Sequence, residues 1–139
     1  MEMEPQTEVE CSYHHDESGL LYERGVTAMR AQHYPEAVAC FEQSIRLRPH
    51  FKSLELLGEC LMRLERHQEA IVPLAAATAL NQQSRAPMLL AQVFLTLGTL
   101  DRAAEMAELA LRRAPDNRRA REVLEQVNSR GAGRSSPEE

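Results

Sequence analysis

Three segments of the chain repeat one another at a constant offset of 33 residues, and no other feature constrains the fold as much. Small residues keep this offset in two sets, which are Gly25, Gly58 and Ala91, and Ala37, Ala70 and Ala103. A fixed repeat of this length marks a solenoid, in which each unit is one supersecondary element stacked on its neighbours. We therefore expect a surface that holds other proteins rather than a site for chemistry.

The composition agrees with a helical solenoid in a single domain of 139 residues. Hydrophobic residues make up 43% of the chain but aromatic residues only 4%, which suits close-packed helices better than a sandwich or a barrel. No apolar run approaches the ~20 residues that cross a bilayer, and the acidic beginning of the chain does not resemble a secretory signal. Three cysteines fit a reducing compartment, so we expect a cytoplasmic protein.

Charge is distributed unevenly along the chain. Residues 1–17 contain six acidic and no basic residues, whereas residues 18–116 are balanced. The first segment therefore reads as a disordered acidic arm. An acidic chain without a basic stripe is not expected to bind nucleic acid or an anionic membrane.

Apolar residues at spacings of three and four predict two helices in the first unit. Ser18 is the expected N-cap of the first helix, and Gln32 and His33 form the turn that follows it. Pro35 then falls in the first turn of the second helix, where its missing N–H is tolerated. Pro49 ends that helix.

The second and third units repeat this plan, and a seventh helix follows them. Pro73 lies inside the second helix of unit two, where it removes a hydrogen bond and should kink the helix. The seventh helix is apolar on one face and polar on the other, as the cap of a solenoid must be. The expected organisation is an arm, three repeats, a capping helix and a flexible tail, over residues 1–17, 18–50, 51–83, 84–116, 117–128 and 129–139.

The repeated residues resemble the tetratricopeptide repeat family, whose pattern combines a Trp-x2-Leu-Gly-x2-Tyr run, an Ala-x3-Phe run and a proline. The matching residues are Leu21, Gly25, Ala28, Ala37, Phe41 and Pro49 in unit one; Leu54, Leu57, Gly58, Leu61, Ala70 and Leu74 in unit two; and Leu90, Ala91, Phe94, Ala103, Ala107 and Pro115 in unit three. The resemblance covers residues 18–116. It implies an all-α, right-handed α-solenoid of three helix-turn-helix repeats with a seventh capping helix.

The sequence departs from the family pattern in three respects. Its period is 33 residues where the family usually has 34, Gln82 replaces a proline, and Ala91 replaces a glycine. The ankyrin repeat, whose period is 33, is the alternative family. Its opening motif is echoed only in residues 86–91, once in three units.

In this family the first helix of each unit lines a concave groove, so the resemblance implies a peptide-binding face here. The positions carried onto this chain are Tyr22, Val26, Met29, Arg30, Lys52, Glu55, Glu59, Met62, Arg63, Arg85, Met88, Gln92, Leu95 and Thr96. The apolar members would provide adaptable contact, and the arginines and Lys52 would bind carboxylates. The alternative is that the methionines belong to the core and the basic residues are only solvated.

Two further expectations concern the charge of this groove. Some family members bind acidic C-termini of chaperones through a clamp of lysines and asparagines, but the matching positions here are Tyr22, Val26, Glu55 and Glu59. That class of client is therefore not expected. The predicted groove has more basic than acidic residues, so the acidic arm could occupy it at high effective concentration.

The leading hypothesis is a non-catalytic adaptor that binds a peptide or helical segment of another protein. The first alternative is a small chaperone of secreted or assembling proteins, and the second is a self-assembling scaffold. We expect a monomer or a weak homodimer.

No cofactor or metal is expected. Cys11, His14 and His15 have a spacing that occurs in zinc sites, but a chance cluster explains it better. Cys40 and Cys60 fall at helix positions typical of small buried residues. No phosphate-binding loop or nucleophile elbow is present, so we do not expect an enzyme.

Overall fold

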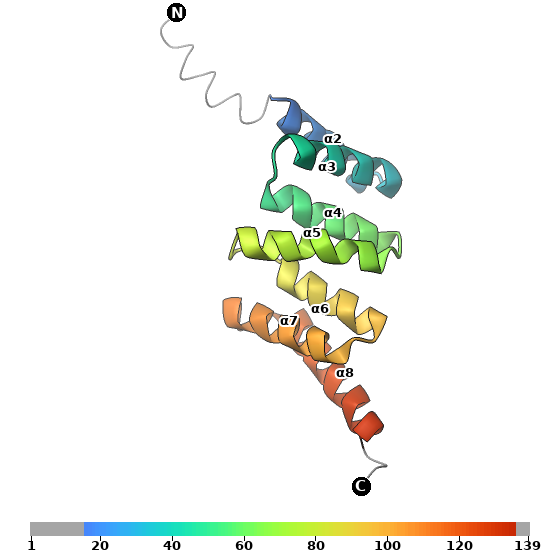
Figure 1. Ribbon diagram of the computed structural model, residues 1–139, viewed down its shortest axis with the longest axis vertical. Helices are drawn as coiled ribbons and strands as arrows, with labels where there is room; N and C mark the ends of the chain where they lie inside the picture. Colours follow the sequence, from blue (N-terminus) through green and yellow to red (C-terminus); the bar gives the residue numbers. More distant parts are fainter. Residues whose placement is uncertain (1–15, 136–139) are drawn as a thin grey trace, which may run out of the picture.

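The structure is a computed structural model that describes residues 16–135, with side chains described as far as Gly131. Within these residues it contains seven helices and no strand. The helices are α2 (Glu17–Arg30), α3 (Tyr34–Leu47), α4 (Phe51–Arg63), α5 (His67–Leu80), α6 (Ala86–Leu97), α7 (Leu100–Arg113) and α8 (Arg118–Ser135). The pairs α2/α3, α4/α5 and α6/α7 stack along the long axis of the molecule, and α8 covers the far end (Figure 1). This confirms the expected all-α solenoid.

The turn inside each helix pair repeats with the same backbone conformation. Gln32, Glu65 and Gly98 have φ values of 64°, 61° and 82°, in the left-handed region. The next residue in each case donates its N–H to a carbonyl five positions earlier, at 2.8–2.9 Å. This is the Schellman ending of a helix. The 33-residue period is therefore a property of the backbone as well as of the side chains.

The two helices of a pair approach closely where the first helix carries glycine. A Cβ atom added to Gly25 would lie 2.7 Å from Cε1 of Phe41, and one added to Gly58 would lie 2.4 Å from Cγ of Leu74. Phe41 and Leu74 are fully buried. In the third pair the same two positions hold Ala91 and Ala107, both buried. Alanine replaces the smaller glycine on the first helix, and alanine also replaces the larger Phe41 or Leu74 on the second.

The ends of the described chain differ from expectation. Asp16, not Ser18, caps α2, because its Oδ1 accepts from the Gly19 amide at 2.7 Å. Ser18 instead exchanges hydrogen bonds with Ser44 on α3. At the other end α8 continues to Ser135, past residue 128 where a tail was expected.

A long-range contact accompanies the extra length of α8. Nη1 of Arg130 donates to the Leu95 carbonyl on α6 at 3.1 Å. This bond attaches the last described turns of α8 to the third pair. The sequence around it is polar and glycine-containing, so composition alone suggested a tail.

Pro73 is buried inside α5, as its place in the sequence required. The kink expected there stays a prediction. Among the described helices, none is both long and apolar enough to cross a membrane.

Candidate peptide-binding groove

The predicted groove residues divide into surface and interior positions. Most lie at the surface or half-buried, on α2, α4 and α6. Three do not: Glu55 is 0% exposed, and Met88 and Leu95, 6% and 9% exposed, belong to the main hydrophobic cluster. Met88 is therefore a core residue, and the side chain of Glu55 lies below the surface of the predicted groove, where a partner could not reach it. Leu95 is also buried, whereas Thr96 is exposed.

An ion-pair network explains how a carboxylate is buried at Glu55. Oε2 of Glu55 accepts from Nε of Arg85 at 2.6 Å and from the Arg85 amide at 3.3 Å, while Oε1 lies 3.8 Å from Nζ of Lys52. Arg85 also donates through Nη2 to Oε1 of Glu59 at 2.9 Å. The network joins α4 to the start of α6, and its two carboxylates are compensated by two cations.

These contacts change the role expected of Arg85. Burial works to lower the pKa of its guanidinium, but the hydrogen bonds to Glu59 and Glu55 outweigh burial and raise the pKa. The sequence predicted that Arg85 would be available to a partner's carboxylate. In the structure it already binds two carboxylates of its own chain.

The remaining basic side chains of the groove are more open. Arg63 stacks near Tyr34, with its Cζ 5.8 Å from the ring centroid and Nη1 3.4 Å from the hydroxyl. Arg30 is exposed and makes no hydrogen bond or ion pair with any other described residue. Arg30 and Arg63 are thus the groove cations that no acidic side chain of the described residues compensates.

Half-buried apolar side chains lie beside these cations. They pack on one side against the core and present the other side at the surface; they are Tyr22, Val26, Met29 and Met62. The ring of Tyr22 lies 5.9 Å from that of Phe41, tilted by 55°, so it has a fixed position. Tyr22, Val26 and Met29 lie at helical spacing on one face of α2 and Met62 lies on α4; these four residues are called the apolar strip below.

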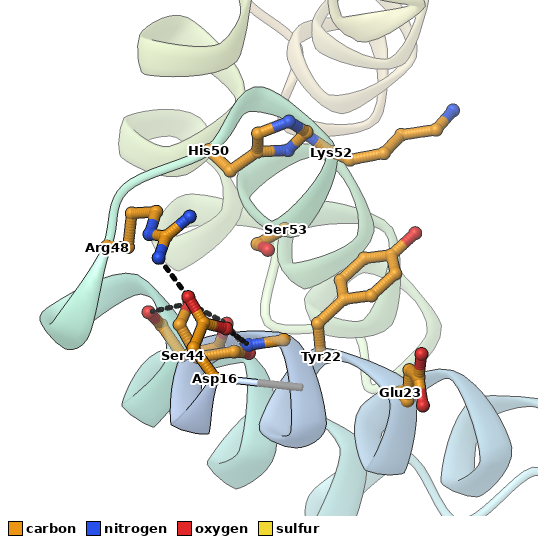
Figure 2. A pocket seen from close by; sticks show the side chains of 10 residues that line it. Asp16, Tyr22, Glu23, Ser44, Arg48, His50, Lys52 and Ser53 are labelled. Carbon is orange, nitrogen blue, oxygen red and sulfur yellow. Dashed lines mark hydrogen bonds and ion pairs between the residues drawn. The ribbon is translucent and has the colours of Figure 1, made fainter. Parts of the chain in front are cut away.

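A small pocket of about 160 Å³ opens next to Tyr22, between α2, the end of α3 and the start of α4 (Figure 2). Its lining residues are Asp16, Ser18, Gly19, Tyr22, Glu23, Ser44, Arg48, His50, Lys52 and Ser53. Sequence reasoning selected only Tyr22 and Lys52 among them. The others come from three separate helices, so no local pattern brings them together.

The two described cysteines lie in the interior. Cys40 and Cys60 are buried free thiols, and burial, with the nearby Glu59 carboxylate, raises the pKa of Cys60 to about 12 despite the opposing charge of Arg63. Between residues 16 and 135 no three His, Cys, Asp or Glu side chains gather as metal ligands. Cys11, His14 and His15 lie outside the described residues.

Solved structures of similar fold cover most of this chain. The first TPR domain of Spaghetti (RPAP3), bound to the HSP90 peptide SRMEEVD, has a TM-score of 0.80 and 22% identity, over 84% of this chain and 94% of that chain. The Sgt2 TPR domain from Aspergillus fumigatus has a TM-score of 0.78 and 19% identity, over 89% and 85%.

A third similar structure is the Yersinia enterocolitica type III secretion chaperone SycD in complex with a peptide of the translocator YopD. Its TM-score is 0.75 and its identity 19%, over 81% of this chain and 92% of that chain. At these identities the likeness establishes the fold. No match is found among curated proteins.

The family itself is established by the sequence. The sequence model of the family described as Tetratricopeptide repeat matches residues 22–85 and 74–118, which together span most of the chain and all three helix pairs. The chain belongs to the tetratricopeptide repeat family, a family of protein-interaction domains.

Proposed function

We propose that this protein is a non-catalytic interaction module that binds a peptide segment of another protein along α2, α4 and α6. The observation that carries the proposal is the apolar strip of Tyr22, Val26, Met29 and Met62, which is ordered by the core and still open at the surface. Side chains fixed in this way lose little conformational entropy on binding. Flexible methionines add tolerance for the shape of the partner.

Similar structures give independent support. Spaghetti (RPAP3) is bound to a peptide of HSP90, and SycD to a peptide of YopD. The HSP90 type of client is not proposed here, because Glu55 and Glu59 stand where the clamp of such domains carries lysine or asparagine. Neither carboxylate can donate a hydrogen bond to an acidic C-terminus, and the cations Lys52 and Arg85 are already engaged by them.

The test is affinity capture from a lysate with the intact chain and with a Tyr22→Ala, Met62→Asp double variant. Met88 is left unchanged because its burial would make an aspartate there unfold the protein. The matched control is Val72→Asp, which changes a side chain on α5 that is 74% exposed. A partner kept by Val72→Asp and lost by the double variant would support the groove, provided that both variants retain the helicity of the parent. A partner captured equally by the intact chain and by both variants would show that the binding site lies elsewhere.

A second candidate is a chaperone that holds export or assembly substrates, and the complex of SycD with a YopD peptide favours it. Such a chaperone would also use the groove, so capture alone does not separate it from an adaptor. Pulse refolding of the captured client would separate them, since a chaperone suppresses aggregation of the unfolded client and an adaptor binds only its folded or peptide form. We place either activity in the cytoplasm, where buried free thiols such as Cys40 and Cys60 stay reduced.

A further inference from the structure

The outer surface of α5 is apolar, unlike that of the helices on either side of it. α3, α5 and α7 form the side of the stack that faces the viewer in Figure 1. No residue between Glu69 and Arg85 is charged. Within this stretch the exposed and half-buried residues at spacings of three and four share one face of the helix, called the outer α5 face below; they are Val72, Ala75, Ala76, Ala79 and Leu80.

The two large side chains of the outer α5 face are open to solvent. Val72 is 74% exposed and Leu80 is 57% exposed. Leu47, which takes the place of Leu80 one unit earlier, is 53% exposed on α3. A helix that is apolar on all sides is normally covered on all sides. Among the described residues no element covers this face, so it is available to a partner.

The neighbouring helices are charged where the outer α5 face is apolar. The residues 33 positions before or after those of this face include Glu42 and Arg46 on α3, and Glu105, Glu108 and Arg112 on α7. All five are exposed, and none forms an ion pair with another described residue. On both helices the carboxylates come first and the arginine follows. Two such helices in antiparallel orientation bring the acidic part of each against the basic part of the other, so the pattern is complementary to itself.

We propose that the outer α5 face pairs with the same face of a second copy of this chain, with the two α5 helices antiparallel about a two-fold axis near Ala76. Val72 of each copy then meets Leu80 of the other, as a two-fold interface requires. The alanines between them have short side chains, so the two helices approach closely where they cross. The partner is thus a second copy because both the apolar pattern and the charges fit their own reverse.

The charged flanks determine the orientation of the pair. On α7, Glu105 of each copy comes opposite Arg112 of the other, and on α3 Glu42 and Arg46 are related in the same way. The groove residues lie on α2, α4 and α6 and take no part in the contact. A pair therefore presents two open grooves, which a partner with two binding segments could occupy together at higher overall affinity. The pairing itself does not depend on the proposed function.

The experiment is sedimentation equilibrium of the full 139-residue chain. An interface of one helix face from each copy is small, so we expect a dissociation constant on the order of 100 µM, and a pair of this strength separates on dilution during chromatography. The mean mass should rise with concentration toward that of two chains. Val72→Asp should raise the dissociation constant about tenfold or more, because the carboxylate would be buried against Leu80 of the other copy. The control is Thr27→Asp, the same charge change at an exposed position on α2, which should alter nothing.

Two charge variants test the antiparallel orientation. Glu105→Arg brings like charges together at both α7 contacts of a pair, and so does Arg112→Glu, so each variant alone should pair about tenfold more weakly than the parent. In an equimolar mixture the mixed pair again joins opposite charges at both contacts. The mixture should therefore recover the affinity of the parent. Both side chains are exposed, so neither change should disturb the fold.

Each outcome decides the proposal. A mass that stays at one chain at every concentration would overturn it, and so would a dimer that Val72→Asp leaves unchanged. A dimer that Val72→Asp dissociates but that the mixed charge variants fail to restore would overturn the antiparallel pairing. A monomer that loses a captured protein or binding to lipid vesicles through Val72→Asp would assign the outer α5 face to that other occupant and overturn the second copy. None of these results affects the groove, which Tyr22→Ala with Met62→Asp tests separately.

Discussion

At the scale of single residues, the close approach of α4 and α5 depends on the missing side chain of Gly58. Alanine normally stabilises a helix relative to glycine by about 1 kcal/mol. At Gly58 the new Cβ would instead lie 2.4 Å from Cγ of the fully buried Leu74. We expect Gly58→Ala to lower the free energy of unfolding by about 2 kcal/mol, measured by urea denaturation, because overpacking exceeds the gain in propensity.

The partner residue provides the control. Leu74→Ala alone should cost about 3 kcal/mol by leaving a cavity, but it removes the atoms with which the Cβ of Gly58→Ala collides. The double variant should therefore lose less stability than the two single variants together, as in a coupled pair. The third helix pair already combines Ala91 with Ala107. Additive losses would show that the collision is relieved in some other way.

A second residue-scale prediction concerns pH and Cys60. The pKa of this fully buried thiol is raised from 9.0 to about 12 in the folded protein, so the unfolded chain ionises first as pH rises. Its contribution to stability is complete below pH 9 and is lost between pH 9 and 12. Compared with Cys60→Ala, the parent should lose about 2 kcal/mol more between pH 8 and pH 10.5 in urea unfolding. Equal losses of unfolding free energy in the parent and in Cys60→Ala would show that the folded protein accommodates the ionised thiolate of Cys60.

At the scale of elements, the left-handed turn residues decide how each helix pair closes. Gly98 suits its φ of 82°, whereas Glu65 adopts 61° with a side chain that disfavours it. Glu65→Gly should therefore raise the free energy of unfolding by about 1 kcal/mol, and Gly98→Ala should lower it by a similar amount. Opposite signs in thermal or urea unfolding are the expected result. A loss in both variants would contradict the argument from strain.

The sequence predicted these elements because their determinants are local or repeat every 33 residues. The glycine and alanine positions, the Gln32–His33 turn and Pro35 at a helix start all follow from neighbours along the chain. What the sequence missed depends on distant partners. Burial of Glu55 requires Arg85, 30 positions away, and Asp16, which caps α2, also pairs with Arg48 just after the end of α3.

The same reason limits what could be foreseen of the site. Surface positions such as Tyr22 and Arg63 follow from helix periodicity. The pocket beside Tyr22 is lined by residues from three separate parts of the chain, so no local pattern in the sequence predicts it. Met88 was misplaced because a methionine fits both core and groove, and periodicity alone could not decide between them.

At the scale of the whole molecule, the first helix of the first pair, α2, differs from its equivalents in the next two pairs in which positions it buries. Arg24 is exposed where the equivalent residues of the next two units, Leu57 and Leu90, are buried. Leu20 is the exception, since it is 46% exposed while Ser53 and Ala86 at the same register are buried. Concentration-dependent light scattering would show whether the chain assembles end to end.

We predict that the negative charge of the acidic arm weakens binding at the groove. Residues 1–15 lie outside the described structure, and their acidic residues are Glu2, Glu4, Glu8 and Glu10. Changing all four to Gln should tighten binding of a peptide from the captured partner, but only about threefold at low salt, because Lys52 and Arg85 already face carboxylates of the groove. Fluorescence anisotropy should show the effect disappearing at 0.5 M NaCl. Asp16 is kept, since it caps α2. Unchanged affinity at low salt would leave the arm without a role at the groove.

The C-terminal end depends on α8, and two truncations separate its contributions. Stopping after Asn128 removes the bond from Arg130 to the Leu95 carbonyl and should cost about 1 kcal/mol. Stopping after Asp116 also removes the buried side chains of Ala120 and Val123, which should cost on the order of 3 kcal/mol and expose apolar surface on α6 and α7. Urea unfolding measures both losses, and size-exclusion chromatography should show self-association only of the shorter protein. If both truncated chains stayed monomeric and equally stable, α8 would be an appendage and not the cap that three stacked pairs require.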